Sequence, residues 1–171
     1  MKSNGFTIVE LLITTGIVGI ISGLSLASFF KTLENERLRS GSRMLASWID
    51  DQRNKAMQYA TPCDIQFNTS TATAESTCDF NSSVNEIFNL RSELSNGGQK
   101  LNVDLVPASA NPWTFSPRGT AGESAALIIT LKNNTSVPGQ CIQLLAPLGL
   151  VRTGRLTDNT NVNTCDFKSV Y

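Results

Sequence analysis

The sequence contains no histidine, the residue that most often serves as a general base or a transition-metal ligand. It also lacks a recognisable nucleophile–base pair, a glycine-rich phosphate loop and a cluster of metal-ligand residues. Asp50 and Asp51 are paired acids, but adjacent side chains on a helix diverge, so we expect both carboxylates in solvent. The sequence therefore predicts no enzyme activity, no cofactor and no metal.

The chain also carries no net charge, because 14 basic side chains balance 14 acidic ones. No strong overall field therefore attracts nucleic acid or anionic lipid. The length of 171 residues leaves room for one domain beyond an N-terminal segment.

A long interval without charge runs from Leu11 to Phe30. A helix of this length spans about 30 Å, roughly the hydrocarbon thickness of a bilayer. A secretory signal peptide would have a shorter apolar region and a small-x-small cleavage site after it, whereas this run passes into a patterned helix. We therefore expect residues 6–30 to form a transmembrane helix.

Glu10 precedes the uncharged run directly, and no Lys or Arg lies between Lys2 and Lys31. A carboxylate in hydrocarbon costs a few kcal/mol and normally has a partner or a function. We expect its partner to come from another molecule.

The stretch from Gly5 to Leu12, Gly-Phe-Thr-Ile-Val-Glu-Leu-Leu, resembles the class III signal of type IV pilins and type II secretion pseudopilins. The resemblance implies that residues 1–5 are a leader, that prepilin peptidase cleaves between Gly5 and Phe6, and that the new N-terminus is methylated. It also implies that Glu10 pairs with the N-terminal amine of a neighbouring subunit in a filament.

Beyond the uncharged run, apolar residues recur at helical spacing as far as Pro62. They form one stripe, which predicts an amphipathic helix to about Ala60, packed on a sheet: Leu38, Leu45, Trp48, Ile49, Gln52, Ala56 and Tyr59. Its charged residues, including Arg53 and Lys55, are expected in solvent.

After Pro62, apolar residues recur at every second position instead of at helical spacing. This alternation predicts about seven to eight short strands. They include 63–67, a return strand to Cys78, 101–105, 113–115, a buried central strand at 125–131, 141–145 and 150–156. Residues 81–99 show little pattern. The fold class predicted is α+β, with a long N-terminal helix on a mostly antiparallel β domain.

The four cysteines, at 63, 78, 141 and 165, all follow the apolar run. An even number in an exported domain predicts two disulfides, and the competing zinc site lacks a Cys-x-x-Cys pair. Three connectivities are possible. A turn centred between Ser70 and Thr71 would place Cys63 opposite Cys78, which favours Cys63–Cys78 with Cys141–Cys165.

The C-terminal half resembles the GspH/FimT domain in the order of its segments. These are Trp113 to Gly119, Leu127 to Leu131, Cys141 to Leu144 and Gly149 to Arg152. The resemblance implies the pilin fold, with residues 31–171 as a periplasmic domain, and a minor pilin or pseudopilin as the function.

Its implied partners are other pilin or pseudopilin subunits, prepilin peptidase and the inner membrane, which the chain would cross once before entering a filament. Type IV pilus and type II secretion subunits share these motifs, and the FimT-like hairpin favours the pilus.

Arg152 and Arg155 are candidate DNA-binding residues, because some FimT-type minor pilins bind DNA through a C-terminal Gly-Arg-x-Arg motif. Leu150 follows Gly149 here, so the first arginine is missing, and Arg155 stands at a different spacing. The pI of about 6.2 is below the value of about 9 typical of nucleic-acid-binding domains. A solvent-facing hairpin and a subunit interface are the competing interpretations.

Overall fold

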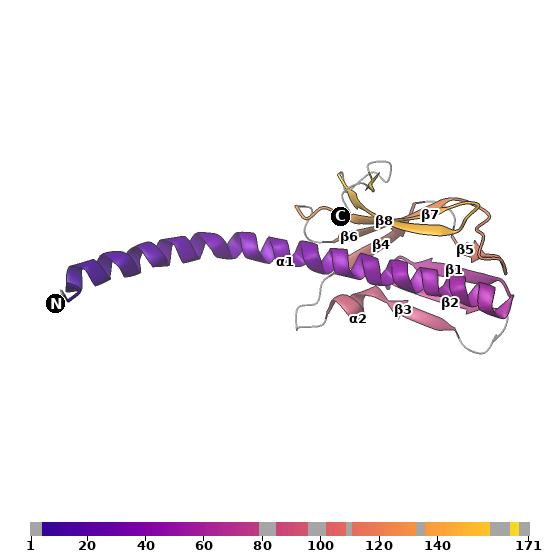
Figure 1. Cartoon of the computed structure of the whole chain (residues 1–171), viewed down its shortest axis with the longest axis horizontal. Helices are drawn as coiled ribbons and strands as arrows, with labels where there is room; N and C mark the ends of the chain where they lie inside the picture. Colours follow the sequence, from indigo (N-terminus) through magenta and orange to yellow (C-terminus); the bar gives the residue numbers. More distant parts are fainter. Residues whose placement is uncertain are drawn as a thin grey trace. The chain divides into compact units, whose positions relative to one another are not determined.

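The computed structural model describes residues 5–78, 85–95, 102–108, 111–132, 136–157 and 165–167, with side chains at all of these except 23–28. The chain divides into two compact units, Met1–Asn35 and Glu36–Tyr171. Helix α1 (Ile8–Tyr59) contributes residues to both units (Figure 1).

The first unit holds the N-terminal part of α1. The hydroxyl of Thr7 accepts a hydrogen bond from the Glu10 N–H at 3.3 Å, which caps the first turn. Over the described residues, no helical segment combines the length and the hydropathy that a bilayer crossing requires. The uncharged run also includes positions 23–28, whose side chains lie outside the described set.

In the second unit, α1 buries the face that the apolar stripe predicted. Leu38, Leu45, Ile49 and Ala56 are fully buried, which confirms the amphipathic helix at these positions. Tyr59 is 48% exposed, so the prediction is wrong there. The physical reason is its position as the last residue of α1, where the chain turns away.

Helix α1 ends one residue before the expected end, Ala60, because Ala60 adopts a left-handed backbone conformation. Ala60 has φ of 53°, and the Thr61 N–H donates to the Ala56 carbonyl at 3.2 Å. This six-to-one hydrogen bond satisfies a carbonyl that the helix itself leaves unpaired. Pro62 then follows, and the next strand begins at Cys63.

The described part of the second unit contains nine strands in two antiparallel sheets. The first sheet has the order β3-β2-β1-β5, with β1 (Cys63–Asn68), β2 (Thr73–Cys78), β3 (Glu86–Asn89) and β5 (Trp113–Phe115). The second has the order β4-β6-β7-β8-β9, with β4 (Val103–Pro107), β6 (Ala125–Leu131), β7 (Gln140–Leu145), β8 (Leu150–Leu156) and β9 (Cys165–Asp166).

Most strand predictions are confirmed, including the central position of β6 between β4 and β7. The sequence did not predict β3 or α2 (Leu90–Leu94), since elements of four and five residues are too short to establish a period. Asn89 caps α2 by accepting a hydrogen bond from the Ser92 N–H at 3.1 Å. Leu94 of α2 packs where Gly41 leaves room on α1.

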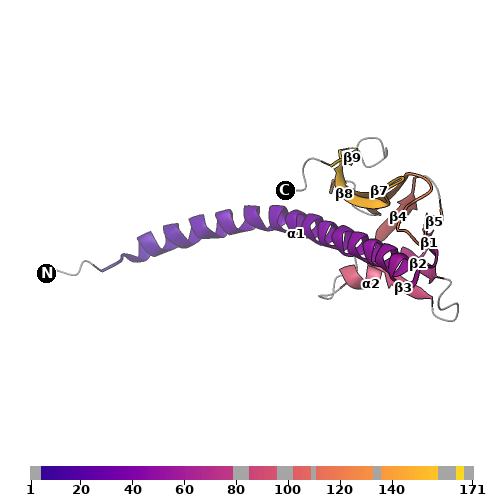
Figure 2. The same cartoon turned by 45° about the vertical axis from the view of Figure 1, so that its right-hand side comes forward.

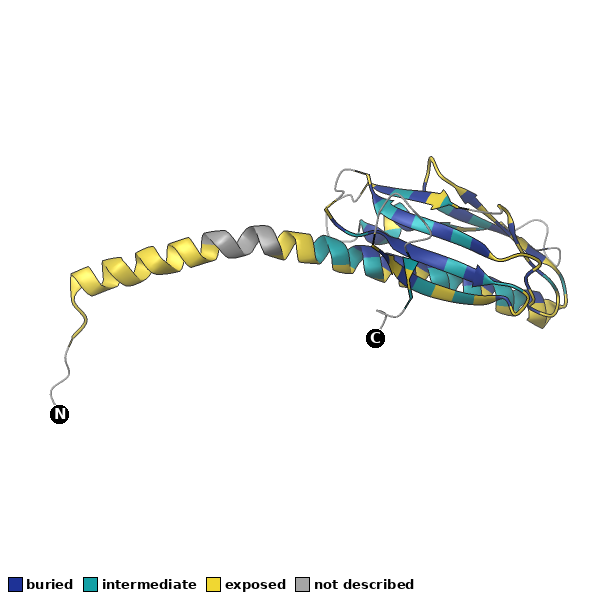
Figure 3. Ribbon diagram, turned by 90° about the horizontal axis from the view of Figure 1, so that it is seen from above, coloured by how far each residue is buried: buried dark blue, intermediate teal, exposed yellow. Residues whose placement is uncertain are grey.

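One apolar core joins the second half of α1 to both sheets. Figures 1 and 2 show the strands lying alongside this part of α1, and Figure 3 shows buried and exposed residues alternating along them. Trp113 and Phe67 meet edge to face in the core, with ring centroids 4.9 Å apart. A helix packed on an antiparallel β domain confirms the predicted α+β class.

Candidate functional site

The residues of the predicted cleavage site lie outside the helix. Gly5, Phe6 and Thr7 precede α1 in non-helical backbone, and Phe6 is 74% exposed. Nothing lies within 4 Å of the position that a Cβ on Gly5 would occupy. The Gly5–Phe6 peptide bond is therefore open to another protein.

Glu10 lies in the first turn of α1, and its side chain is exposed. Among the described residues, no basic nitrogen forms an ion pair with its carboxylate. A negative charge near a helix N-terminus is favourable, because the dipole of the helix is positive there. The exposed carboxylate is thus available to an outside cation.

Apolar side chains surround this part of α1. Those that are more than half exposed within the chain are Phe6, Ile8, Val9, Leu11, Leu12, Ile13, Ile17, Val18, Ile20 and Ile21. Hydroxyl groups on this part of α1 form hydrogen bonds with the backbone of the same helix. Those of Thr15 and Ser22 donate to the carbonyls of Leu11 and Val18 at 2.9 and 2.7 Å. Such a surface requires lipid or protein around it.

The structure joins Cys63 to Cys78 and Cys141 to Cys165. Cys63 lies directly opposite Cys78 in the β1–β2 register, with 4.2 Å between the Cα atoms. The second bond connects β7 to β9 across β8, with 6.4 Å between the Cα atoms. It passes Gly154, where an added Cβ would lie 3.0 Å from the sulfur of Cys165.

The structure does not bring the two candidate DNA-binding arginines together. Arg152 and Arg155 are three positions apart on the regular strand β8, so their side chains leave opposite faces of the sheet. Arg152 donates to the side-chain oxygen of Gln143 at 3.1 Å and lies 4.9 Å from the centroid of the Phe167 ring. Its guanidinium is therefore already engaged by protein groups.

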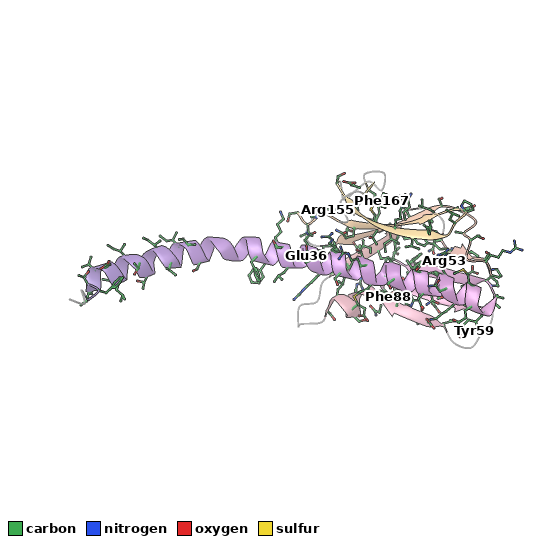
Figure 4. The ribbon with its side chains drawn as sticks, in the orientation of Figure 1. Glu36, Arg53, Tyr59, Phe88, Arg155 and Phe167 are labelled. Atoms are coloured by element: carbon green, nitrogen blue, oxygen red, sulfur yellow. A yellow bond between two sulfur atoms is a disulfide. The ribbon has the colours of Figure 1, made fainter. Side chains whose placement is uncertain are left out.

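Arg155 lies opposite Asp166 in the β8–β9 register. Figure 4 labels Arg155 on β8 and Phe167, which directly follows β9. A carboxylate beside Arg155 offsets its charge, which weakens attraction to a phosphate backbone.

Two charged residues of α1 do not lie in solvent as the sequence predicted. Arg53 donates from Nε to the Gly119 carbonyl at 2.8 Å and from a terminal nitrogen to the Leu148 carbonyl at 3.2 Å. Lys55 contacts Glu86 at 2.6 Å and Asp51 at 2.9 Å. Asp51 is four residues before Lys55 on the same helix, a spacing that the sequence displays. No sequence signal identified Gly119, Leu148 or Glu86, because they lie on strands and turns far along the chain.

The ion pair between Lys55 and Glu86 shifts the pKa of both side chains. Partial burial acts to lower the pKa of Lys55, but hydrogen bonds to Glu86 and Asp51 outweigh it, and the pKa is raised. The hydrogen bond from Lys55, followed by that from Gln52, lowers the pKa of Glu86. Both charged forms are thus stabilised where α1 meets β3.

The described residues contain no group of three His, Cys, Asp or Glu side chains arranged to hold a metal ion.

No protein-family model matches the chain, and no curated protein sequence matches it. Among solved structures, it is similar to the type IV minor pilin FimU of Pseudomonas aeruginosa strain PAO1 in two crystal forms. One superposes with a TM-score of 0.55 at 13% identity, covering 74% of this chain and 97% of that chain. The other gives 0.52 at 11% identity, covering 71% and 98%. The chain therefore has the type IV pilin fold.

Proposed function

We propose that this protein is a minor pilin, a structural subunit of a type IV pilus. The observation that carries the proposal is the exposed apolar surface of residues 6–22 with Glu10 at its start, on a chain that has the pilin fold. On an isolated monomer in water, such an apolar surface would be exposed at a cost in free energy. A filament of packed helices supplies both the apolar contacts and a cation for Glu10.

In this proposal, residues 6–30 first hold the subunit in the inner membrane, with residues 31–171 in the periplasm. Prepilin peptidase removes residues 1–5 and methylates the amine of Phe6. The non-helical backbone around Gly5 supports this step, because a peptidase needs an extended substrate. Extraction into the filament then exchanges lipid contacts for contacts between helices.

Glu10 selects the register of assembly by pairing with the Phe6 amine of a neighbouring subunit. Two opposite charges 4 Å apart attract by about 4 kcal/mol at the effective dielectric constant near a protein surface. The Thr7 hydroxyl accepts a hydrogen bond from the Glu10 N–H at 3.3 Å and fixes the backbone there, so pairing has to order only the Glu10 side chain.

The pilus is favoured over a type II secretion pseudopilus because the solved structures that resemble this chain are described as type IV minor pilins. DNA binding through Arg152 and Arg155 stays a prediction, and the geometry of β8 gives it no specific support.

The test is replacement of Glu10 in cells that assemble the filament. Glu10→Val should leave expression and removal of residues 1–5 unchanged, as measured by mass spectrometry of the mature N-terminus. The amount of the Glu10→Val protein in sheared filaments should fall at least about tenfold relative to the wild type, which corresponds to 1.4 kcal/mol. Glu10→Asp, which keeps the charge, is the matched control and should retain most incorporation.

Normal incorporation of Glu10→Val would remove the assembly role of this residue. A wild-type chain that keeps residues 1–5 in the cell would remove the pilin proposal itself.

A further inference from the structure

Strand β8 lies at the edge of the second sheet along most of its length. On one side, β7 pairs with β8 from Leu150 to Arg155. On the other side, β9 pairs only with Arg155 and Leu156. Among the strands that the structure describes, none pairs with residues 150–154 on the side away from β7. Residues 150–154 therefore form an open edge of the sheet.

This open edge carries unpaired backbone groups. The Leu156 N–H donates to the Gly139 carbonyl at 2.9 Å, so the backbone groups of Leu156 face β7. Because alternate residues of a strand face the same neighbour, those of Arg152 also face β7. The N–H and carbonyl groups of Val151 and Thr153 consequently face away from β7, where no described strand pairs with them. A strand edge of this kind accepts an extended segment of another protein.

Strand β9 shows how this side of β8 is paired. It runs antiparallel to β8, with Asp166 opposite Arg155 and Cys165 opposite Leu156. A residue with a carboxylate therefore already stands opposite an arginine across these two strands. Opposite charges at facing positions stabilise the pairing of strands.

The open edge presents an arginine without such a carboxylate. Arg152 is exposed, and Leu150, two positions earlier on the same face, is 44% exposed. The contacts of the Arg152 guanidinium are the Gln143 side-chain oxygen and the Phe167 ring, which are neutral. No carboxylate among the described residues forms an ion pair with it. These contacts orient the guanidinium and leave its charge uncompensated.

We propose that the open edge of β8 binds an extended, antiparallel segment of a protein partner. An acidic residue of that segment lies opposite Arg152, and an aliphatic residue lies opposite Leu150. The segment exchanges backbone hydrogen bonds with Val151 and Thr153 and so adds a strand to the second sheet. This site does not depend on the assembly role of Glu10.

The experiment uses the ¹⁵N-labelled full chain in detergent micelles. The probe is acetyl-Ser-Thr-Asp-Val-Leu-amide, which in antiparallel pairing places aspartate opposite Arg152 and leucine opposite Leu150. The backbone N–H signals of Val151 and Thr153 should move on titration, and that of Ala74 on β2 should stay in place. At least about threefold more of the peptide with lysine in place of aspartate should be needed, because like charges then face each other.

Methyl groups on the peptide backbone test the hydrogen bonds. N-methylation of the threonine and valine of the probe removes the two N–H groups that would face β8. Binding should then weaken at least about tenfold. N-methylation of the aspartate and leucine leaves those two N–H groups in place, so this matched control peptide should retain most of the binding.

One variant tests the charge. Arg152→Gln should reduce the preference for the aspartate peptide over the lysine peptide to less than about twofold, because the facing cation is gone. The matched control is Arg43→Gln, since Arg43 is exposed on α1, and it should keep the wild-type preference.

Any of five results overturns the proposal. The first four are no movement of the Val151 and Thr153 signals at about 10 mM peptide, equal affinity of the wild type for the aspartate and lysine peptides, equal losses with the two methylated peptides, and an unchanged preference in Arg152→Gln. The fifth is slow hydrogen exchange of the Val151 and Thr153 amides without peptide, which would mean that the chain itself covers this edge.

Discussion

The guanidinium of Arg53 lies against the backbone of Gly119, with 2.8 Å between Nε and the carbonyl oxygen. The same side chain also reaches the Leu148 carbonyl, so one residue of α1 holds two turns of the β domain. Asp50, one turn earlier on α1, lies 3.5 Å from the guanidinium and helps to orient it.

Arg53→Met should lower the free energy of unfolding by about 1–3 kcal/mol, because two carbonyls lose a charged donor. Thermal unfolding of the full chain in detergent micelles measures this change. Arg43→Met is the matched control, since Arg43 is exposed on the same helix, and should change stability by less than about 0.5 kcal/mol. Equal effects of the two variants would show that the Arg53 contacts do not stabilise the fold.

Gly149→Ala should be destabilising by more than about 1 kcal/mol. Gly149 has φ of 65°, and an added Cβ would lie 2.3 Å from the Gly119 oxygen that Arg53 binds. Gly122→Ala is the control, because its Cβ meets nothing within 4 Å. Chemical denaturation of both variants makes the comparison, and a neutral Gly149→Ala would mean that the two turns are not in close contact.

The Lys55–Glu86 pair should make stability depend on pH at both ends of the range. The pKa of Glu86 is lowered from 4.5, so its contribution is present above that value and is lost as pH falls through the folded-state pKa. The pKa of Lys55 is raised from 10.5, so its contribution is present below that value and is lost as pH rises through the folded-state pKa. Both groups are partly exposed, so solvent screening limits the effect to about 1 kcal/mol or less.

Glu86→Gln measures the acidic part of this dependence. Its unfolding free energy should fall less than that of the wild type between about pH 6 and pH 3. As the control, Glu93→Gln should show the same pH dependence of the unfolding free energy as the wild type. Parallel curves for wild type and Glu86→Gln would show that the pair makes no difference to stability.

Non-reducing peptide mapping of the exported protein should recover Cys63 linked to Cys78 and Cys141 linked to Cys165. Replacing Cys63 and Cys78 together by alanine should cost about 3 kcal/mol, the loop-entropy value for a sequence separation of 15. A Cys63–Cys141 peptide would contradict both the β1–β2 hairpin and the bond across β8.

Gel shifts of the full chain should show DNA binding only at low salt. Arg152 and Arg155 point to opposite faces of β8 and cannot jointly contact one phosphate backbone. The double variant Arg152→Ala and Arg155→Ala should therefore change the apparent affinity less than about tenfold. A greater loss in the double variant, with folding retained, would establish the arginine site.

Most of the fold prediction rested on the regular spacing of apolar residues along the sequence. The burial of Leu45 and Ile49 followed from helical spacing, and the central strand β6 followed from its apolar residues. These signals are readable because they depend on neighbours within one element. The opposite directions of Arg152 and Arg155 were also implied by the predicted strand at 150–156, since an odd spacing reverses the face.

The sequence by itself determined that an uncharged run follows Glu10, that a helix precedes the strands, and where most of those strands lie. Only the tertiary structure decided that Arg53 meets Gly119 and Leu148, 66 and 95 positions away, and that β9 pairs with only Arg155 and Leu156 of β8. Local pattern specifies an element and the face that it buries. Contacts between distant residues depend on how the elements pack, and no local repeat records that arrangement.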